Sequence, residues 1–125
     1  MSTHSHRFSK TIFGLAAGCL LTVAPSLSGT VSAQTILQVA LQDSSIRPTQ
    51  IVTTKDEVVS LTVVNQGKKV HNLVIPDFYI FTQNLNPGER VKVSFTPDKI
   101  GAFPYYSDTG GKPEPGMRGT MRVHN

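Results

Sequence analysis

Apolar and polar residues alternate in short runs along most of the chain beyond residue 33, and β-branched side chains are common in these runs. Alternation with a period of two places one face of an extended segment in a core, whereas a helix needs a period near 3.6. The runs are Ile36 to Leu41, Ile51 to Thr53, Val58 to Val64, Val70 to Ile75, Phe78 to Leu85, Val91 to Phe95, Ala102 to Tyr106 and Arg118 to His124. We therefore predict an all-β, two-sheet β-sandwich of about eight short strands.

Turn-forming residues separate these runs. Asp43 to Pro48 is a turn-rich break, and Asn65-Gln66-Gly67 ends the clearest strand. In Asn86-Pro87-Gly88-Glu89, proline presets φ at the second turn position and glycine accepts a positive φ at the third. Thr96 to Gly101 is another such connection. The regular spacing of turns is typical of a sandwich and leaves no room for a linker.

The first 33 residues are typical of a secretory signal peptide. Arg7 and Lys10 precede an apolar stretch from Ile12 to Ala24, and Val31-Ser32-Ala33 forms a small-residue cleavage site before Gln34. The apolar stretch is shorter than the roughly 20 residues of a membrane span. We predict a signal peptide over 1–33 and one domain over 34–125. The protein is then exported to a periplasm, another lumen or the exterior, with no transmembrane segment after cleavage.

Cys19 offers an alternative, because Ala16-Ala17-Gly18 before it loosely matches a lipoprotein cleavage site. However, the apolar stretch continues beyond Cys19, whereas a lipoprotein motif normally ends it, so cleavage after Ala33 is favoured. The domain then keeps no cysteine, and it has neither a disulfide nor a thiolate ligand.

The charge balance gives no indication of a nucleic-acid partner. Removal of Arg7 and Lys10 lowers the number of lysines and arginines from 12 to 10 against 8 acidic residues, which leaves a net charge of +2. A solvated surface explains scattered charge of this size, although the cations could also form a basic face for an acidic partner.

Two segments carry candidate chemistry. His71 opens the run H-N-L-V-I, and the C-terminal segment Y-Y-S-D-T-G-G-K-P-E-P-G-M-R-G-T places Ser107, Lys112 and Met117 at intervals of five. Together with the order of turns, these segments resemble the cupredoxin family of plastocyanin and azurin. The resemblance implies a Greek-key sandwich whose type 1 copper site takes one His from an upstream loop and Cys, His and Met from a downstream loop.

Two of the four ligands that this resemblance implies are replaced. Ser107 falls at the Cys position and Lys112 at the second His position, while His71 and Met117 are retained. Blue copper needs a thiolate and two imidazoles, and the methionine is only a weak axial ligand. A neutral hydroxyl is a poor ligand and an ammonium has no lone pair. The resemblance therefore indicates the fold more strongly than it indicates electron transfer.

The retained residues leave several interpretations open. His71 is either a ligand or a hydrogen-bonded structural residue, and Met117 either an axial ligand or a packing residue. Met121 lies four residues after Met117, so both side chains point to the same face of an extended segment. Met121 is therefore either a core residue or a second thioether ligand for Cu(I). Asn72 matches a position that ties the ligand loops together in relatives of this kind.

The downstream loop adds three more candidates. Asp108 and Glu114 either form a harder metal site with His71 or belong to a solvated, ion-paired loop. Lys112 suggests a sharper hypothesis, in which its ammonium fills the space of the copper ion and donates to Ser107.

We therefore predict an exported cupredoxin-like domain with a degenerate copper site. The favoured function is a non-redox binding or accessory module that contacts a protein partner through the loop end of the sandwich. The alternative is a copper carrier or delivery protein that uses His71 and Met117, and a blue-copper electron carrier is disfavoured. No cofactor other than copper is indicated. An enzyme is not expected, because Ser107 lacks a base and an acid at motif spacing.

Overall fold

The computed structural model describes residues 34–125, so the predicted signal peptide and Cys19 lie outside the described residues. This part of the chain forms nine strands and one short 3-10 helix: β1 (Gln34–Leu41), β2 (Ile46–Arg47), β3 (Gln50–Thr54), β4 (Val58–Asn65), β5 (Val74–Ile75), η2 (Pro76–Phe78), β6 (Ile80–Phe81), β7 (Arg90–Phe95), β8 (Gly101–Tyr106) and β9 (Arg118–His124). The predicted all-β class is confirmed, with nine strands here where the pattern indicated about eight.

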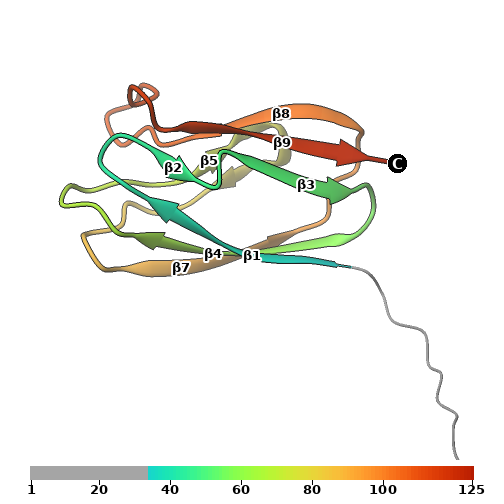
Figure 1. The fold of residues 1–125 in the computed structure, drawn as a ribbon, viewed down its shortest axis with the longest axis horizontal. Coiled ribbons are helices and arrows are strands. Elements are labelled where there is room, and N and C mark those ends of the chain that lie inside the picture. The colour runs from blue at the N-terminus through green and yellow to red at the C-terminus, as the bar shows by residue number, and fades with distance from the viewer. Residues whose placement is uncertain (1–33) are drawn as a thin grey trace, which may run out of the picture. The chain divides into compact units, whose positions relative to one another are not determined.

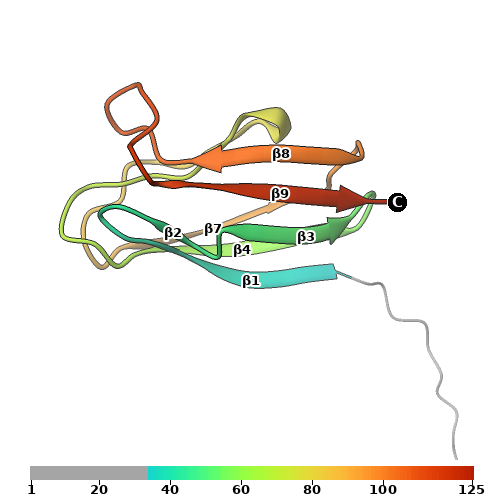
Figure 2. The same cartoon turned by 45° about the horizontal axis from the view of Figure 1, so that its top comes forward.

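The strands form the two layers of a sandwich (Figures 1 and 2). One sheet has the order β2-β1-β4-β7 and the other the order β3-β9-β8-β5-β6. β1 pairs with β4 in parallel, and β3 pairs with β9 in parallel. Parallel neighbours cannot be joined by a tight hairpin, so the chain must cross between the layers, as it does after β2 and β3.

The core lies between the two sheets and follows the alternation of the sequence. In β4, Val59, Leu61 and Val63 are fully buried, while the intervening residues are more exposed. Tyr105 and Met121 cover the same core from the opposite sheet. Burial of each large side chain of this kind contributes roughly 1.5–3 kcal/mol. This core makes the sandwich a firm base for its loops.

Two predicted strands are shorter than the pattern indicated. The run from Val70 to Ile75 is a strand only at Val74–Ile75, and His71 forms an isolated bridge with Leu85. The run from Phe78 to Leu85 is a strand only at Ile80–Phe81. Pro76 starts η2, and Tyr79 then takes a left-handed φ of 57°, which reverses the chain. A proline and a left-handed residue override the apolar pattern at this point.

The break from Asp43 to Pro48 contains a strand that the sequence did not indicate. β2 pairs antiparallel with β1 through Ala40 and Leu41, and Ile46 is fully buried. The burial of one large apolar side chain therefore decides the conformation of a turn-rich segment. This hairpin places Asp43 at its tip.

Four connections lie at the same end of the sandwich (Figure 1). We call this region the loop end; it consists of residues 42–45, 66–73, 82–89 and 107–117. Hydrogen bonds join these connections to one another, from Lys68 to Asp43, from His71 to Leu85 and between Asn72 and Ser107. The loop end is thus one connected unit.

Candidate functional site

Asn65 shapes the loop that carries His71. This residue is fully buried, and its side-chain Nδ2 donates to the carbonyl oxygens of Lys69 at 2.7 Å and Leu85 at 2.8 Å. Its Oδ1 accepts from the amide of Gly67 at 2.9 Å. A buried amide with three partners fixes the turn after β4. This turn places His71 opposite Leu85, and the backbone amide of each residue donates to the carbonyl oxygen of the other.

The imidazole of His71 is fully buried between two carboxylates. Its Nε2 lies 3.0 Å from Oδ1 of Asp43, and its Nδ1 lies 3.1 Å from Oε2 of Glu114. Ionised carboxylates only accept hydrogen bonds, so both bonds form together only when each ring nitrogen carries a proton. The imidazole thus links its own connection to those that carry Asp43 and Glu114. We call Asp43, His71 and Glu114 the histidine clasp.

Three donors converge on one oxygen of Glu114. Oε2 accepts from Ser107 at 2.5 Å and from Thr109 at 3.1 Å, in addition to His71. Burial of this side chain favours the neutral acid, but the three hydrogen bonds outweigh burial and hold the pKa of Glu114 below its ordinary value of 4.5. Glu114 therefore stays an anion where the clasp needs one.

Asp43 is the other anion of the clasp. Its Oδ1 accepts from His71 and from the backbone amides of Lys68 at 2.8 Å and Lys69 at 3.1 Å. The hydrogen bond with His71, followed by that from Lys68, lowers the pKa of Asp43 below its ordinary value of 3.8. Gly67 permits this approach, because a Cβ at Gly67 would overlap the Asp43 carboxylate.

A second set of hydrogen bonds ties the His71 loop to the downstream loop. The buried amide of Asn72 donates to Oγ of Ser107 at 3.1 Å. The Asn72 side chain accepts from the amide of Asp108 at 2.7 Å and donates to the Asp108 carboxylate at 3.0 Å. Asn72 therefore has the loop-tying role that the family resemblance implied.

Ser107 connects the two sets of hydrogen bonds, which gives a testable prediction. Replacing Ser107 with alanine should lower the free energy of unfolding by about 1–3 kcal/mol, because it leaves the buried amide of Asn72 without a partner and removes a donor from Glu114. Chemical denaturation measures the change. Ser94 on β7 is exposed, so Ser94→Ala is the matched control. Equal stability of the two variants would contradict this role of Ser107.

Comparisons with known proteins agree with the β-sandwich fold. The family profile described as "Cupredoxin-like domain" matches residues 13–121. The chain belongs to the cupredoxin-like family. No curated protein matches the sequence.

Solved structures of other cupredoxins share the fold. An auracyanin from Roseiflexus castenholzii is 17% identical over 76% of this chain and 100% of its own, with a TM-score of 0.62. Auracyanin A from Chloroflexus aurantiacus, described as a "blue" copper protein, is 15% identical over 74% of this chain and 100% of its own, also with a TM-score of 0.62. The multicopper oxidase mgLAC matches at 14% identity and a TM-score of 0.65. The match to mgLAC covers 74% of this chain and only 39% of the oxidase.

The cupredoxin-like domain places the sequence-predicted site residues in different environments. Lys112 is exposed, so the hypothesis that its ammonium fills the copper space and donates to Ser107 is wrong. The hydroxyl of Ser107 is held by Asn72 and Glu114 instead. Met117 and Met121 are fully buried members of the apolar core.

These residues do not fit a type 1 copper site. Ser107 offers a neutral hydroxyl in place of a thiolate, and both nitrogens of His71 already face carboxylates. Within residues 34–125, no group of three or more His, Cys, Asp and Glu side chains has an arrangement that could hold a metal ion. Whether His71 and Met117 bind copper stays a prediction; binding would require Asp43 or Glu114 to give up its bond to His71.

Sequence reasoning found part of the clasp. It placed Glu114, together with Asp108, beside His71 as possible ligands of a harder metal, but it missed the contacts of Asp43 and Thr109. Asp43 lies 28 residues from His71, and no motif spacing joins the two. The available signal was the aspartate at a predicted turn, next in space to the Asn65-Gln66-Gly67 turn once β1 and β4 are paired.

Proposed function

We propose that this cupredoxin-like domain is a non-redox binding or accessory module that contacts a protein partner through the loop end. The histidine clasp carries this proposal. Where family resemblance implies a metal that joins two loops, a buried imidazole between two carboxylates joins them instead. A charged pair of hydrogen bonds with good geometry can hold loops without a metal ion.

The surroundings of the clasp support a role in binding. The sandwich core, Asn65 and Asn72 hold the loop end in one conformation, and a preformed surface loses little entropy when it binds. Within residues 34–125, no helix has the length and apolar character needed to cross a bilayer. Export to a periplasm, another lumen or the exterior remains part of the proposal, and it rests on the predicted signal peptide.

Copper should leave the stability of the full-length chain unchanged. A ligand at 100 times its dissociation constant stabilises a folded protein by about 2.7 kcal/mol, which would raise the melting temperature of a small domain by roughly 10 °C or more. Thermal melts with Cu(I), with Cu(II) and with a chelator measure this effect. We expect the same melting temperature in all three. Copper-specific stabilisation of that size would contradict the metal-free proposal.

The copper carrier or delivery protein is the alternative, and a titration separates it from the proposal. Stoichiometric Cu(I) binding that is lost on replacing His71 with alanine would favour the carrier. Both nitrogens of His71 already face carboxylates, and this supports the binding module over the carrier.

A further inference from the structure

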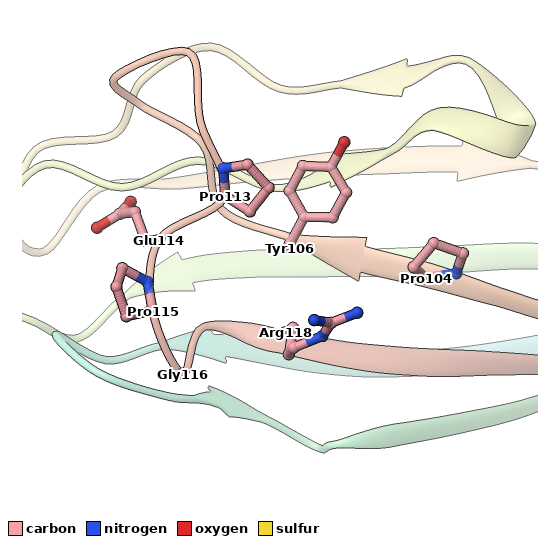
Figure 3. Close-up of a pocket in the computed structure, with 7 residues that line it drawn as sticks. All are labelled: Pro104, Tyr106, Pro113, Glu114, Pro115, Gly116 and Arg118. Atoms are coloured by element: carbon pink, nitrogen blue, oxygen red, sulfur yellow. The ribbon is translucent and has the colours of Figure 1, made fainter.

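A small pocket lies beside the clasp, on the outer face of β8 and β9. Its volume is about 240 Å³. Tyr105 points into the core, so Tyr106, the next residue on β8, points to the outer face. Tyr106 is paired across the sheet with Arg118, the first residue of β9. Figure 3 shows the Arg118 side chain below the Tyr106 ring and the Pro113 ring beside it.

The walls of the pocket are apolar and stiff. Pro104, Pro113 and Pro115 line it together with Tyr106. Each proline ring fixes its own φ, and the segment is also held by backbone hydrogen bonds from Glu114 to Ser107 at 2.8 Å and from Met117 to Glu114 at 3.1 Å. The pocket is therefore formed before any ligand arrives, which reduces the entropic cost of binding.

The residues that line the pocket include one cation, Arg118, and one carboxylate, Glu114. Arg118 is exposed. Among residues 34–125, the salt bridges join Lys55 to Asp56 and His71 to Asp43 and Glu114, so none of them involves Arg118. Glu114 also lines the pocket, but its carboxylate points away from the Tyr106 ring in Figure 3 and is bonded to His71, Ser107 and Thr109. Because the Glu114 carboxylate is held by these three partners, it does not pair with Arg118, and the guanidinium is available to a ligand.

We propose that this pocket binds an acidic peptide segment of a protein partner. The carboxylate of an Asp or Glu side chain pairs with the guanidinium of Arg118, whose planar fork matches a carboxylate in two hydrogen bonds. A neighbouring apolar side chain packs between Tyr106 and Pro113. The volume is below the range of about 300–1,000 Å³ that suits drug-sized molecules, and it suits one or two side chains. This inference rests on the proposed function, since it names the chemistry of the protein partner.

The test uses the ¹⁵N-labelled full-length chain and two peptides, acetyl-Leu-Glu-Leu-amide and acetyl-Leu-Gln-Leu-amide. We expect saturable amide shifts at Tyr106, Gly116 and Arg118 with the acidic peptide, and at least about tenfold weaker binding of the neutral one. Arg118→Gln should weaken binding of the acidic peptide by a similar factor. Arg122→Gln is the matched control, because Arg122 is exposed on the same face of β9 but outside the pocket.

Three outcomes would overturn the pocket proposal: no shifts with either peptide, equal binding of the two peptides, or unchanged binding in Arg118→Gln. An unchanged spectrum of each variant away from the pocket confirms that it folds. Copper melts of the same protein report separately on the metal-free claim. If the peptide binds and copper also stabilises the protein, the metal-free proposed function is wrong but the pocket proposal holds. If the peptide does not bind and copper has no effect, the pocket proposal is wrong but the proposed function holds.

Discussion

Replacing His71 with alanine should lower the free energy of unfolding by about 3 kcal/mol. A hydrogen bond to a charged group typically contributes about 1.5–3 kcal/mol, and the ring of His71 contacts two carboxylates, those of Asp43 and Glu114. The total is reduced here, since the side chains of Asp43 and Glu114 are 36% and 23% exposed and water can reach them once His71 is gone. The empty space left by the buried ring adds to the loss.

Urea denaturation of the full-length chain measures this change. His124 is exposed at the end of β9, so His124→Ala is the matched control and should change stability by less than about 0.5 kcal/mol. A His71→Ala variant as stable as this control would mean that the clasp does not hold the loop end.

Acid should destabilise the protein as the clasp carboxylates become protonated. The pKa values of Asp43 and Glu114 are held below 3.8 and 4.5, so the unfolded chain binds more protons than the folded chain in this range. Stability therefore rises with pH there. Their contribution is complete above about pH 5 and is lost as the pH falls through the lowered pKa values of the folded state.

Denaturation midpoints measured from pH 6 to pH 2.5 test this dependence. Glu114→Gln removes one of the titrating groups, so this variant should be less stable at pH 6 and should lose stability less steeply below pH 5. Glu57→Gln makes the same change of charge outside the loop end and serves as the control. An acid slope that is identical in wild type and Glu114→Gln would contradict the assignment of this carboxylate.

The fold was predictable because its signals are local. Alternation in β4, β7 and β9 marks which face is buried, and the Asn86 to Glu89 turn follows from its proline and glycine, with Gly88 at a φ of 88°. The short elements were not predictable in this way. β2 exists because Ile46 reaches the core, and β6 begins only at Ile80 because the 3-10 helix that starts at Pro76 and the left-handed Tyr79 turn the chain. Tertiary packing and two backbone conformations decide those segments.

The site was only half predictable, because its chemistry depends on pairs far apart in sequence. The family spacing correctly directed attention to His71, Ser107 and the downstream loop, but it could not show what replaces a missing ligand. Glu114 lies three residues before Met117, and its carboxylate meets both His71 and Ser107. Asp43 comes from a hairpin tip on the other sheet. Such convergence exists only after the sandwich has formed.

The ¹⁵N spectrum of the His71 ring in histidine-labelled full-length protein tests the central claim most directly. If the clasp replaces a metal, Asp43 and Glu114 keep their contacts with the two ring nitrogens, and one equivalent of Cu(I) or Cu(II) leaves the signals of both nitrogens unchanged. A His71 signal that copper shifts or broadens at one equivalent would contradict the account. The signal of the exposed His124 provides the internal reference.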